Sequence, residues 1–564
     1  MGQPDERVLE GTGVSPGVGY GPALRLARSV PEPPSTGYEG DAEAEAARAA
    51  EAMEETARDL SARGEKAGGQ AQEVLSAQAL MARDPALADD VRRRVREGAA
   101  AARAVADAFG VYREMLAAAG EYMAARVADL DDVRDRIVAR LLGVPVPGVP
   151  ESDTPFVLVA ADLAPADTAT LDPDQVLAFV TREGGPTSHS AILARSLGLP
   201  AVVAGAAADG IAEGAALLVD GTAGEVVADP SAERVERARA RQAAREAAAA
   251  QSGGPGATSD GHRVPLLANI GGPKELPAAL ENGAEGVGLY RTEFLFLDRG
   301  EAPGHEEQVE AYRAVLDAFP AGSKVVVRTL DAGADKPLAF LPPPGEEPNP
   351  ALGVRGLRMM RRHPEMLSSQ LTALAEAARG AQAVLNVMAP MVTDAEDAAW
   401  FAERAQEAGI EHAGVMVEVP AAALGARHLA RSAGFFSIGT NDLTQYACAA
   451  DREAGGLSRF QDPWQPAVLE LIAATARAAA AAERPCGVCG EAAADPLLAC
   501  VLVGAGVTTL SMGASALPLV RAALSRASLE ECKAAASAAL DAPGIDEAKR
   551  AARDALPGVA ELGL

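Results

Sequence analysis

The C-terminal half of the chain carries eight short apolar runs separated by helical stretches, and this repeat constrains the fold more than any other feature. Each run has the length and aliphatic composition of a buried strand. The predicted strands are 264–270, 286–290, 325–329, 384–388, 414–419, 435–439, 486–489 and 508–512. Eight β/α repeats in about 300 residues fit a (β/α)8 (TIM) barrel, whose usual size is about 250 residues. An open doubly wound sheet is the alternative architecture.

The N-terminal half reads as an α/β domain interrupted by helices. Residues 8–26 are short β structure with Gly-rich turns, and strands return at 156–160, 176–180, 201–204, 216–219 and 225–227. Between them, residues 41–143 are rich in Ala, Glu and Arg, with breaks at 68–69, 84–85 and Gly98. An apolar stripe from Met123 to Leu141 marks the last helix of this block. We therefore expect this block to be a helical subdomain inserted into the α/β domain.

A polar, charged helix follows the α/β domain and ends in Ser-Gly-Gly-Pro-Gly at 252–256, a composition typical of a linker. We therefore divide the chain into five parts. Residues 1–30 and 144–229 form one α/β domain, 31–143 an inserted helical subdomain, 230–258 a linker helix, and 259–564 the barrel. Such a linker suggests that the two halves move relative to one another.

Charge and composition exclude several classes of protein. The formal net charge of −28 argues against nucleic acid and anionic membrane surfaces, since both need surplus Lys and Arg. No apolar run reaches the ~18 residues that span a bilayer, and the N-terminus lacks the apolar core of a signal peptide. Five cysteines make no disulfide framework in so long a chain. We therefore expect a cytoplasmic protein.

His189 stands at the start of a predicted helix over 190–197, after a glycine pair, with Thr187 or Ser188 as N-cap. The free N–H groups and partial positive charge of a helix N-terminus disfavour imidazolium, so the ring should stay neutral and nucleophilic. The same N–H groups would stabilise an attached phosphoryl group. His189 is thus a candidate phosphate carrier, and a surface histidine that only caps a helix is the alternative.

A barrel places catalytic groups where its strands end. Polar or reactive residues occupy nearly every such position: Arg291, Arg328, Asp331, Met388, Glu418, Asn441, Asp442 and Cys489. Glu418 and Asp442 follow neighbouring strands and could share Mg²⁺, which takes one or two carboxylates plus substrate oxygens and water. A salt bridge or a cap is the alternative for each carboxylate alone.

Arginine and cysteine complete this predicted site. Arg291, Arg328 and Arg452 offer planar forks suited to phosphate and carboxylate groups. Cys486 and Cys489 form a CxxC pair, but their spacing on a strand points the two side chains to opposite faces, which argues against shared metal or redox chemistry. Cys489 is either a buried structural cysteine or a proton donor at the barrel mouth.

The motifs that hold these residues resemble Enzyme I of the bacterial phosphoenolpyruvate:sugar phosphotransferase system. They occur in the order seen in that family, over essentially the whole chain: GGPTSHSAILARSLGLPAVV, GLYRTEFLF, RTLDAGADKP, NPALGVRGLR, VMVEVPAA, FFSIGTNDLTQY, ADR and GVCGEAAAD. The resemblance implies a phosphotransferase that moves the phosphoryl group of phosphoenolpyruvate to its own histidine, then to the phosphocarrier protein HPr. It also implies a homodimer through the barrel and a helical subdomain that docks HPr.

Carried over residue by residue, the resemblance makes His189 the phosphorylated nucleophile and Cys489 the acid that protonates the enolate. It makes Glu418 and Asp442 the Mg²⁺ ligands, and it assigns phosphoenolpyruvate binding to Arg291, Arg328, Asn441, Asp442 and Arg452. The sequence departs from the family pattern at Pro186, where many members carry a basic residue, and at Ala334, where glycine is common.

Three other functions compete with this interpretation. A pyruvate phosphate dikinase or phosphoenolpyruvate synthase would need a large ATP-binding domain, for which we expect no segment of this chain. A catalytically silent relative would lack His189, Cys489 or a metal carboxylate, and all are present. A metal-dependent pyruvate lyase built on the barrel would have no use for the domain that carries His189.

Overall fold

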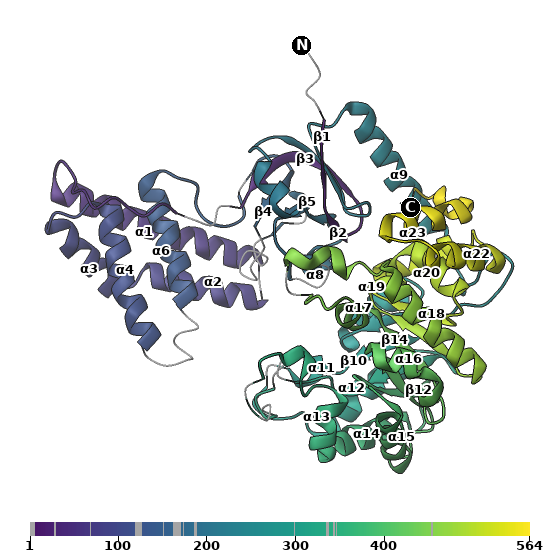
Figure 1. The fold of residues 1–564 in the computed structure, drawn as a ribbon. Helices are drawn as coiled ribbons and strands as arrows, with labels where there is room; N and C mark the ends of the chain where they lie inside the picture. The colour runs from purple at the N-terminus through teal and green to yellow at the C-terminus, as the bar shows by residue number, and fades with distance from the viewer. Residues whose placement is uncertain are drawn as a thin grey trace. The chain divides into compact units, whose positions relative to one another are not determined.

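The computed structural model describes residues 6–26, 30–67, 69–118, 127–150, 152–161, 171–172, 174–184, 189–297, 299–333, 338–341, 345, 347–452 and 455–563. The chain forms two compact units, Met1–Ala238 and Arg239–Leu564 (Figure 1). No helix in these described ranges is long and apolar enough to cross a bilayer.

The second unit is a closed parallel barrel, which confirms the predicted architecture and excludes the open sheet. Its described strands are β9 (Leu266–Ile270), β10 (Val287–Arg291), β11 (Lys324–Arg328), β12 (Val384–Ala389), β13 (Ala413–Val417), β14 (Phe436–Gly439), β15 (Cys486–Cys489) and β16 (Thr509–Met512). The barrel closes where β16 pairs in parallel with β9, with Leu510 opposite Leu266.

Helices surround this barrel and bury the outer faces of its strands. The longer ones are α12 (His305–Asp317), α14 (Pro364–Ala378), α15 (Ala395–Glu407), α16 (Pro420–Leu429), α17 (Thr440–Cys448), α18 (Pro466–Ala481), α20 (Pro496–Gly504), α21 (Leu517–Leu524), α22 (Leu529–Leu540) and α23 (Ile545–Ala555). Shorter helices are α10 (Leu276–Glu281), α11 (Glu293–Phe296), α13 (Leu357–Arg362), α19 (Glu491–Ala494) and α24 (Pro557–Ala560). A separate, smaller apolar cluster that includes Leu289, Met388 and Met416 lies inside the barrel.

The first unit contains the predicted α/β domain, and its sheet is mixed. Its described strands are β1 (Arg7–Glu10), β2 (Thr12–Ser15), β3 (Val18–Arg25), β4 (Phe156–Ala160), β5 (Val176–Thr181), β6 (Ala201–Val203), β7 (Ala216–Asp220) and β8 (Glu225–Ala228). They lie in the order β1-β8-β7-β3-β4-β5-β6-β2, with β3 to β6 parallel. Because β3 pairs directly with β4, the chain between them is an insertion. Glycines permit the tight packing here: a Cβ on Gly19 would lie 2.4 Å from the carbonyl oxygen of Leu177.

The insertion is helical, as predicted. Its described helices are α1 (Ala42–Ala67), α2 (Gly69–Ala82), α3 (Pro85–Arg96), α4 (Ala101–Ala118) and α6 (Val127–Leu142). They share one apolar core with Leu60, Val95 and Ile137 at its centre. Asp84 caps α3 through two backbone N–H groups, and Gly98 adopts a φ of 105° after it. Met123 lies outside the described residues.

The predicted linker helix, α9 (Ala232–Gln251), contains the boundary between the two units. Ala238 is buried with Leu218 and Val227 of the first unit. Arg245 is buried in the second, where its guanidinium donates to the carbonyl oxygens of Leu562 and Gly563. The second half of the helix therefore belongs to the barrel unit.

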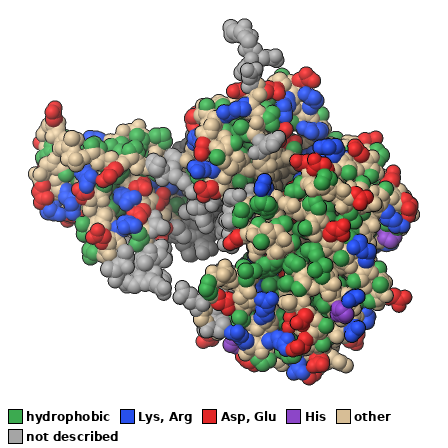
Figure 2. All heavy atoms as spheres, in the orientation of Figure 1, with side chains coloured by type: hydrophobic (Ala, Val, Ile, Leu, Met, Phe, Trp, Pro, Cys, Tyr) green, Lys and Arg blue, Asp and Glu red, His purple; other side chains and the backbone are tan. Residues whose placement is uncertain are grey.

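On the face drawn in Figure 2, Lys and Arg side chains are interspersed with Asp and Glu among the described residues. This face shows no continuous basic patch, in keeping with the net charge of −28.

Candidate active site

The barrel gathers the predicted site residues at one end. Arg291, Arg328 and Cys489 are the last residues of β10, β11 and β15. Glu418 directly follows β13, and the pair Asn441 and Asp442 lies in the first turn of α17, which begins where β14 ends. Since all these strands are parallel, their carboxyl ends meet at the same barrel mouth.

Arg328 is buried among carboxylates. Its Nη2 donates a short hydrogen bond to Glu293 and lies 3.4 Å from Asp331 Oδ2. Burial by itself lowers the pKa of the guanidinium, but the surrounding carboxylates, Glu293 and Asp331 foremost, outweigh it and raise the pKa above its ordinary value. The Nε of Arg328 is buried and has no hydrogen-bond partner among the described residues. A buried donor without a partner costs free energy, so a ligand that offers an acceptor to this atom gains binding energy.

Arg291 has the same unsatisfied donor. Its Nε is buried without a described partner, and its guanidinium lies 5.0 Å from the centre of the Phe294 ring. Burial lowers the pKa of Arg291, and the nearby Arg328 cation adds to this effect. Two cations with unpaired donors at one barrel mouth make a site for an anionic ligand.

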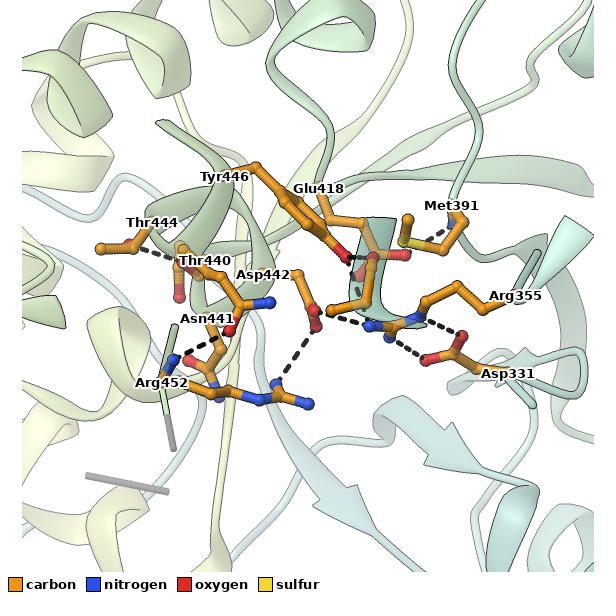
Figure 3. Close-up of polar contacts among 12 residues, drawn as sticks. Asp331, Arg355, Met391, Glu418, Thr440, Asn441, Asp442, Thr444, Tyr446 and Arg452 are labelled. Carbon is orange, nitrogen blue, oxygen red and sulfur yellow. Dashed lines mark hydrogen bonds and ion pairs between the residues drawn. The ribbon is translucent and has the colours of Figure 1, made fainter. Parts of the chain in front are cut away.

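Arg355 links the carboxylates beneath this mouth (Figure 3). It is 0% exposed; its Nη2 lies 2.8 Å from Asp331 Oδ2, and its Nη1 lies 3.2 Å from Asp442 Oδ1. Nη1 of Arg452 approaches the other oxygen of Asp442 at 3.4 Å. Two arginines therefore hold the side chain of Asp442 in a fixed orientation.

Sequence reasoning named neither Arg355 nor Glu293 as a site residue. Arg355 lies in the long connection between β11 and β12 rather than at the end of a strand, so the barrel rule could not single it out. Their only signal in the sequence is that both lie in motifs of the resembled family, Arg355 in NPALGVRGLR and Glu293 in GLYRTEFLF.

Glu418 is buried, and its Oε1 accepts a 2.6 Å hydrogen bond from the backbone N–H of Met391. Burial, followed by repulsion from Asp442 and Asp331, raises its pKa to about 7. A Cβ at position 439 would lie 3.0 Å from Glu418 Oε2, so Gly439 leaves the carboxylate room.

These carboxylates fit a hard divalent cation. Among the described residues, no group of three or more His, Cys, Asp and Glu side chains is arranged to hold a metal ion. Two carboxylates, Glu418 and Asp442, are nevertheless what Mg²⁺ takes when substrate and water supply its other oxygens. A cation between them would also relieve the repulsion that raises the pKa of Glu418.

Cys489 is buried in the barrel interior, whereas Cys486 belongs to the outer core, which confirms that the pair points to opposite faces. The hydroxyl of Ser437 donates to Cys489 Sγ at 3.4 Å, and Sγ donates to the carbonyl oxygen of Ile438 at 3.5 Å. Burial raises the pKa of Cys489 to about 11. The thiol therefore holds its proton at neutral pH and is a candidate acid.

His189 belongs to the first unit and is the first residue of α8 (His189–Leu197), which begins one residue before the predicted start at Ser190. Gly198 follows with a φ of 67°. Arg195 secures the helix by donating to the carbonyl oxygen of Val14 in β2 at 2.8 Å. The side chain of His189 and the residues Pro186, Thr187, Ser188 and Ala334 lie outside the described residues.

Family models match nearly the whole chain. Those of the N-terminal, mobile and PEP-binding domains of PEP-utilising enzymes match residues 10–126, 152–224 and 245–529. Together with the barrel and its arginine-lined mouth, they define a PEP-utilising enzyme.

Relatives over the full length specify the class further. A protein of Streptomyces coelicolor is 61% identical over 556 residues, 98% of this chain and 100% of that protein. One from Haloferax volcanii is 41% identical, covering 95% and 97%, and one from Bacillus subtilis is 38% identical, covering 93% and 95%. All three are named phosphoenolpyruvate-protein phosphotransferase. The chain belongs to the phosphoenolpyruvate-protein phosphotransferase family.

Proposed function

We propose that this chain transfers the phosphoryl group of phosphoenolpyruvate to His189 and then to a histidine of HPr, releasing pyruvate, as the first step of sugar uptake by the phosphotransferase system. One observation carries the proposal. Two arginines with unpaired buried donors, two carboxylates and a protonated thiol meet at one barrel mouth. A phosphorylated enol acid needs these groups together: cations for its anionic ends and a proton for its carbon.

In this proposal Arg291 and Arg328 bind the substrate through their guanidinium groups, and Asn441 and Arg452 complete the substrate-binding site. The unpaired Nε atoms would gain acceptors from the phosphate and carboxylate oxygens of the substrate. Binding would thus remove two buried unsatisfied donors, which favours the complex over the free enzyme. Asp442, held by Arg355 and Arg452, contributes to both substrate and metal binding.

Glu418 and Asp442 would hold Mg²⁺, which when bound neutralises charge on the phosphoryl oxygens. The neutral imidazole of His189 then forms a bond to phosphorus as the bond from phosphorus to the enol oxygen breaks. Positioning and charge stabilisation supply most of the catalysis, because phosphoryl transfer has a loose transition state. Cys489 gives its proton to the enolate carbon, and pyruvate leaves.

The assignments of parts and partners belong to the same proposal. Residues 1–30 and 144–229 form the phosphohistidine domain, 31–143 dock HPr, 230–258 link the halves, and 259–564 bind the substrate and form a homodimer. The enzyme works in the cytoplasm. Movement about the linker lets His189 serve both the barrel and HPr. A crosslink that locks the linker should allow loading or unloading of His189 but not both, and unimpaired two-step turnover would contradict the movement.

One experiment tests the core of the proposal. The protein is incubated with phosphoenolpyruvate labelled in its phosphate and with Mg²⁺, and the labelled peptide is mapped. We expect one label, stable to base and labile to acid, on the peptide that contains His189. Purified HPr should then remove it. A label elsewhere, or none, would contradict the proposed function.

A further inference from the structure

The amino-terminal end of the barrel is incompletely filled. A cavity of about 20 Å³ lies inside it, lined by Lys324, Ser437, Thr509 and Ser511 among others. That volume is enough for one water molecule, and the hydroxyl groups of its walls could hold one. Glycines create the space: a Cβ on Gly288 would lie 2.4 Å from Ser511 Oγ.

Lys324 is the charged residue in the lining of this cavity. It is the first residue of β11, half-buried, and its ammonium lies 5.8 Å from the centre of the Phe435 ring. No carboxylate among the described residues forms an ion pair with it. Burial lowers the pKa of the ammonium, which makes the group a better proton donor than an exposed lysine.

Ser437 connects the cavity to the proposed acid. Its side chain lines the cavity, and its hydroxyl donates to Cys489 Sγ at 3.4 Å. Cys489 itself is 2% exposed. A thiolate left there after each turnover has a hydroxyl donor on the cavity side, while substrate and metal ligands occupy the mouth.

We propose that the buried thiolate of Cys489 is reprotonated from the amino-terminal end of the barrel, through Ser437, one cavity water and Lys324. This inference rests on the proposed role of Cys489 as acid. The S–H bond of Cys489 breaks as the C–H bond of pyruvate forms. The Ser437 hydroxyl gives its proton to Sγ and takes one from the water, which takes one from the ammonium of Lys324. The neutral amine regains its proton from solvent, so only protons move.

The test compares two rates at equilibrium in deuterated solvent with phosphoenolpyruvate, pyruvate and Mg²⁺. One is the exchange of labelled carbon between pyruvate and phosphoenolpyruvate, and the other is deuterium entry into the pyruvate methyl group. Carbon exchange needs Cys489 only to take and return a proton, whereas deuterium entry needs that proton to exchange with solvent. The ratio of the two rates therefore reports the relay.

In Lys324→Met we expect the ratio of deuterium entry to carbon exchange to fall at least fivefold, because the abstracted proton returns to the same substrate. Lys533→Met is the matched control, since Lys533 is exposed and pairs only with Glu530 among the described residues. Ser437→Ala should lower the ratio as well, and it carries the test if Lys324→Met does not fold.

An unchanged ratio in a folded Lys324→Met protein would overturn the relay, whether both rates stay the same or fall in proportion. Loss of carbon exchange in the unmodified protein would instead contradict the proposed function. The two failures are therefore distinguishable.

Discussion

Arg355 and Asp442 form a buried ion pair, with Nη1 of the arginine 3.2 Å from Oδ1 of the aspartate. Nη2 of the same guanidinium lies 2.8 Å from Oδ2 of Asp331. One fully buried cation thus holds two carboxylates that would otherwise repel each other. The proposed metal ligand Asp442 owes its orientation to a residue from a distant part of the chain.

Replacing Arg355 with Met should destabilise the barrel by about 3–5 kcal/mol, because it removes the fully buried cation that bridges two buried carboxylates. Urea unfolding measures the loss. Arg361→Met is the control, since Arg361 also pairs with two carboxylates but at the surface, and it should cost less than about 1 kcal/mol. Equal effects of the two changes would contradict a structural role for the Arg355 pair.

His189→Ala should abolish phosphate uptake from phosphoenolpyruvate and leave the barrel folded, because the nucleophile belongs to the other compact unit. Labelling followed by gel analysis measures uptake, and circular dichroism checks the fold. His305→Ala, at an exposed histidine paired with Glu376, should label normally. A phosphate that is labile to acid and stable to base on the His189 variant would refute the assignment.

Cys489→Ala should slow pyruvate formation by about 10²–10⁴-fold, the usual contribution of a positioned acid, with little change in substrate binding. Cys486→Ala is the matched control on the same strand, and it should retain turnover. Because burial raises the pKa of Cys489 to about 11, the rate should not fall from loss of this proton between pH 6 and 9. Stopped-flow coupling to pyruvate reduction measures the rate. Unchanged turnover in the Cys489 variant would remove its role as acid.

Glu418→Gln should stabilise the metal-free protein at high pH. The folded pKa of about 7 exceeds the ordinary value of 4.5, mainly because of burial, so ionising this group costs the folded state more than the unfolded state. The unmodified protein therefore loses stability as pH rises from about 4.5 to 7, and the variant does not. We expect a difference of about 1–3 kcal/mol at pH 8 and little at pH 4.5, measured by urea unfolding in chelator. A variant that is less stable at pH 8 would contradict the prediction.

Mg²⁺ should bind more tightly as pH rises, since it competes with the proton on Glu418. With a pKa of about 7, apparent affinity should increase roughly tenfold from pH 6 to pH 8. Calorimetric titration at several pH values measures this dependence. Glu418→Gln should bind weakly at every pH, and activity in excess chelator would count against both carboxylates.

Local sequence patterns predicted much of this structure. The eight barrel strands and the residues at their ends follow from apolar runs, because side chains that end parallel strands must meet at one mouth. The opposite orientation of Cys486 and Cys489 follows from the two-residue period of a strand. The position of α8 was predicted to within one residue, from the glycine pair before it and Gly198 after it.

What the sequence by itself determined is therefore which elements form and which side chains their ends present, since both depend on neighbours within a few residues. Only the tertiary structure decided the pairing of Arg355 with Asp442, 87 residues apart, and the space between Lys324 and Ser437 inside the barrel. The physical reason is that burial, and with it the pKa of Glu418 or Cys489, is set by what packs around a group. Distant segments supply that packing, and no local pattern records it.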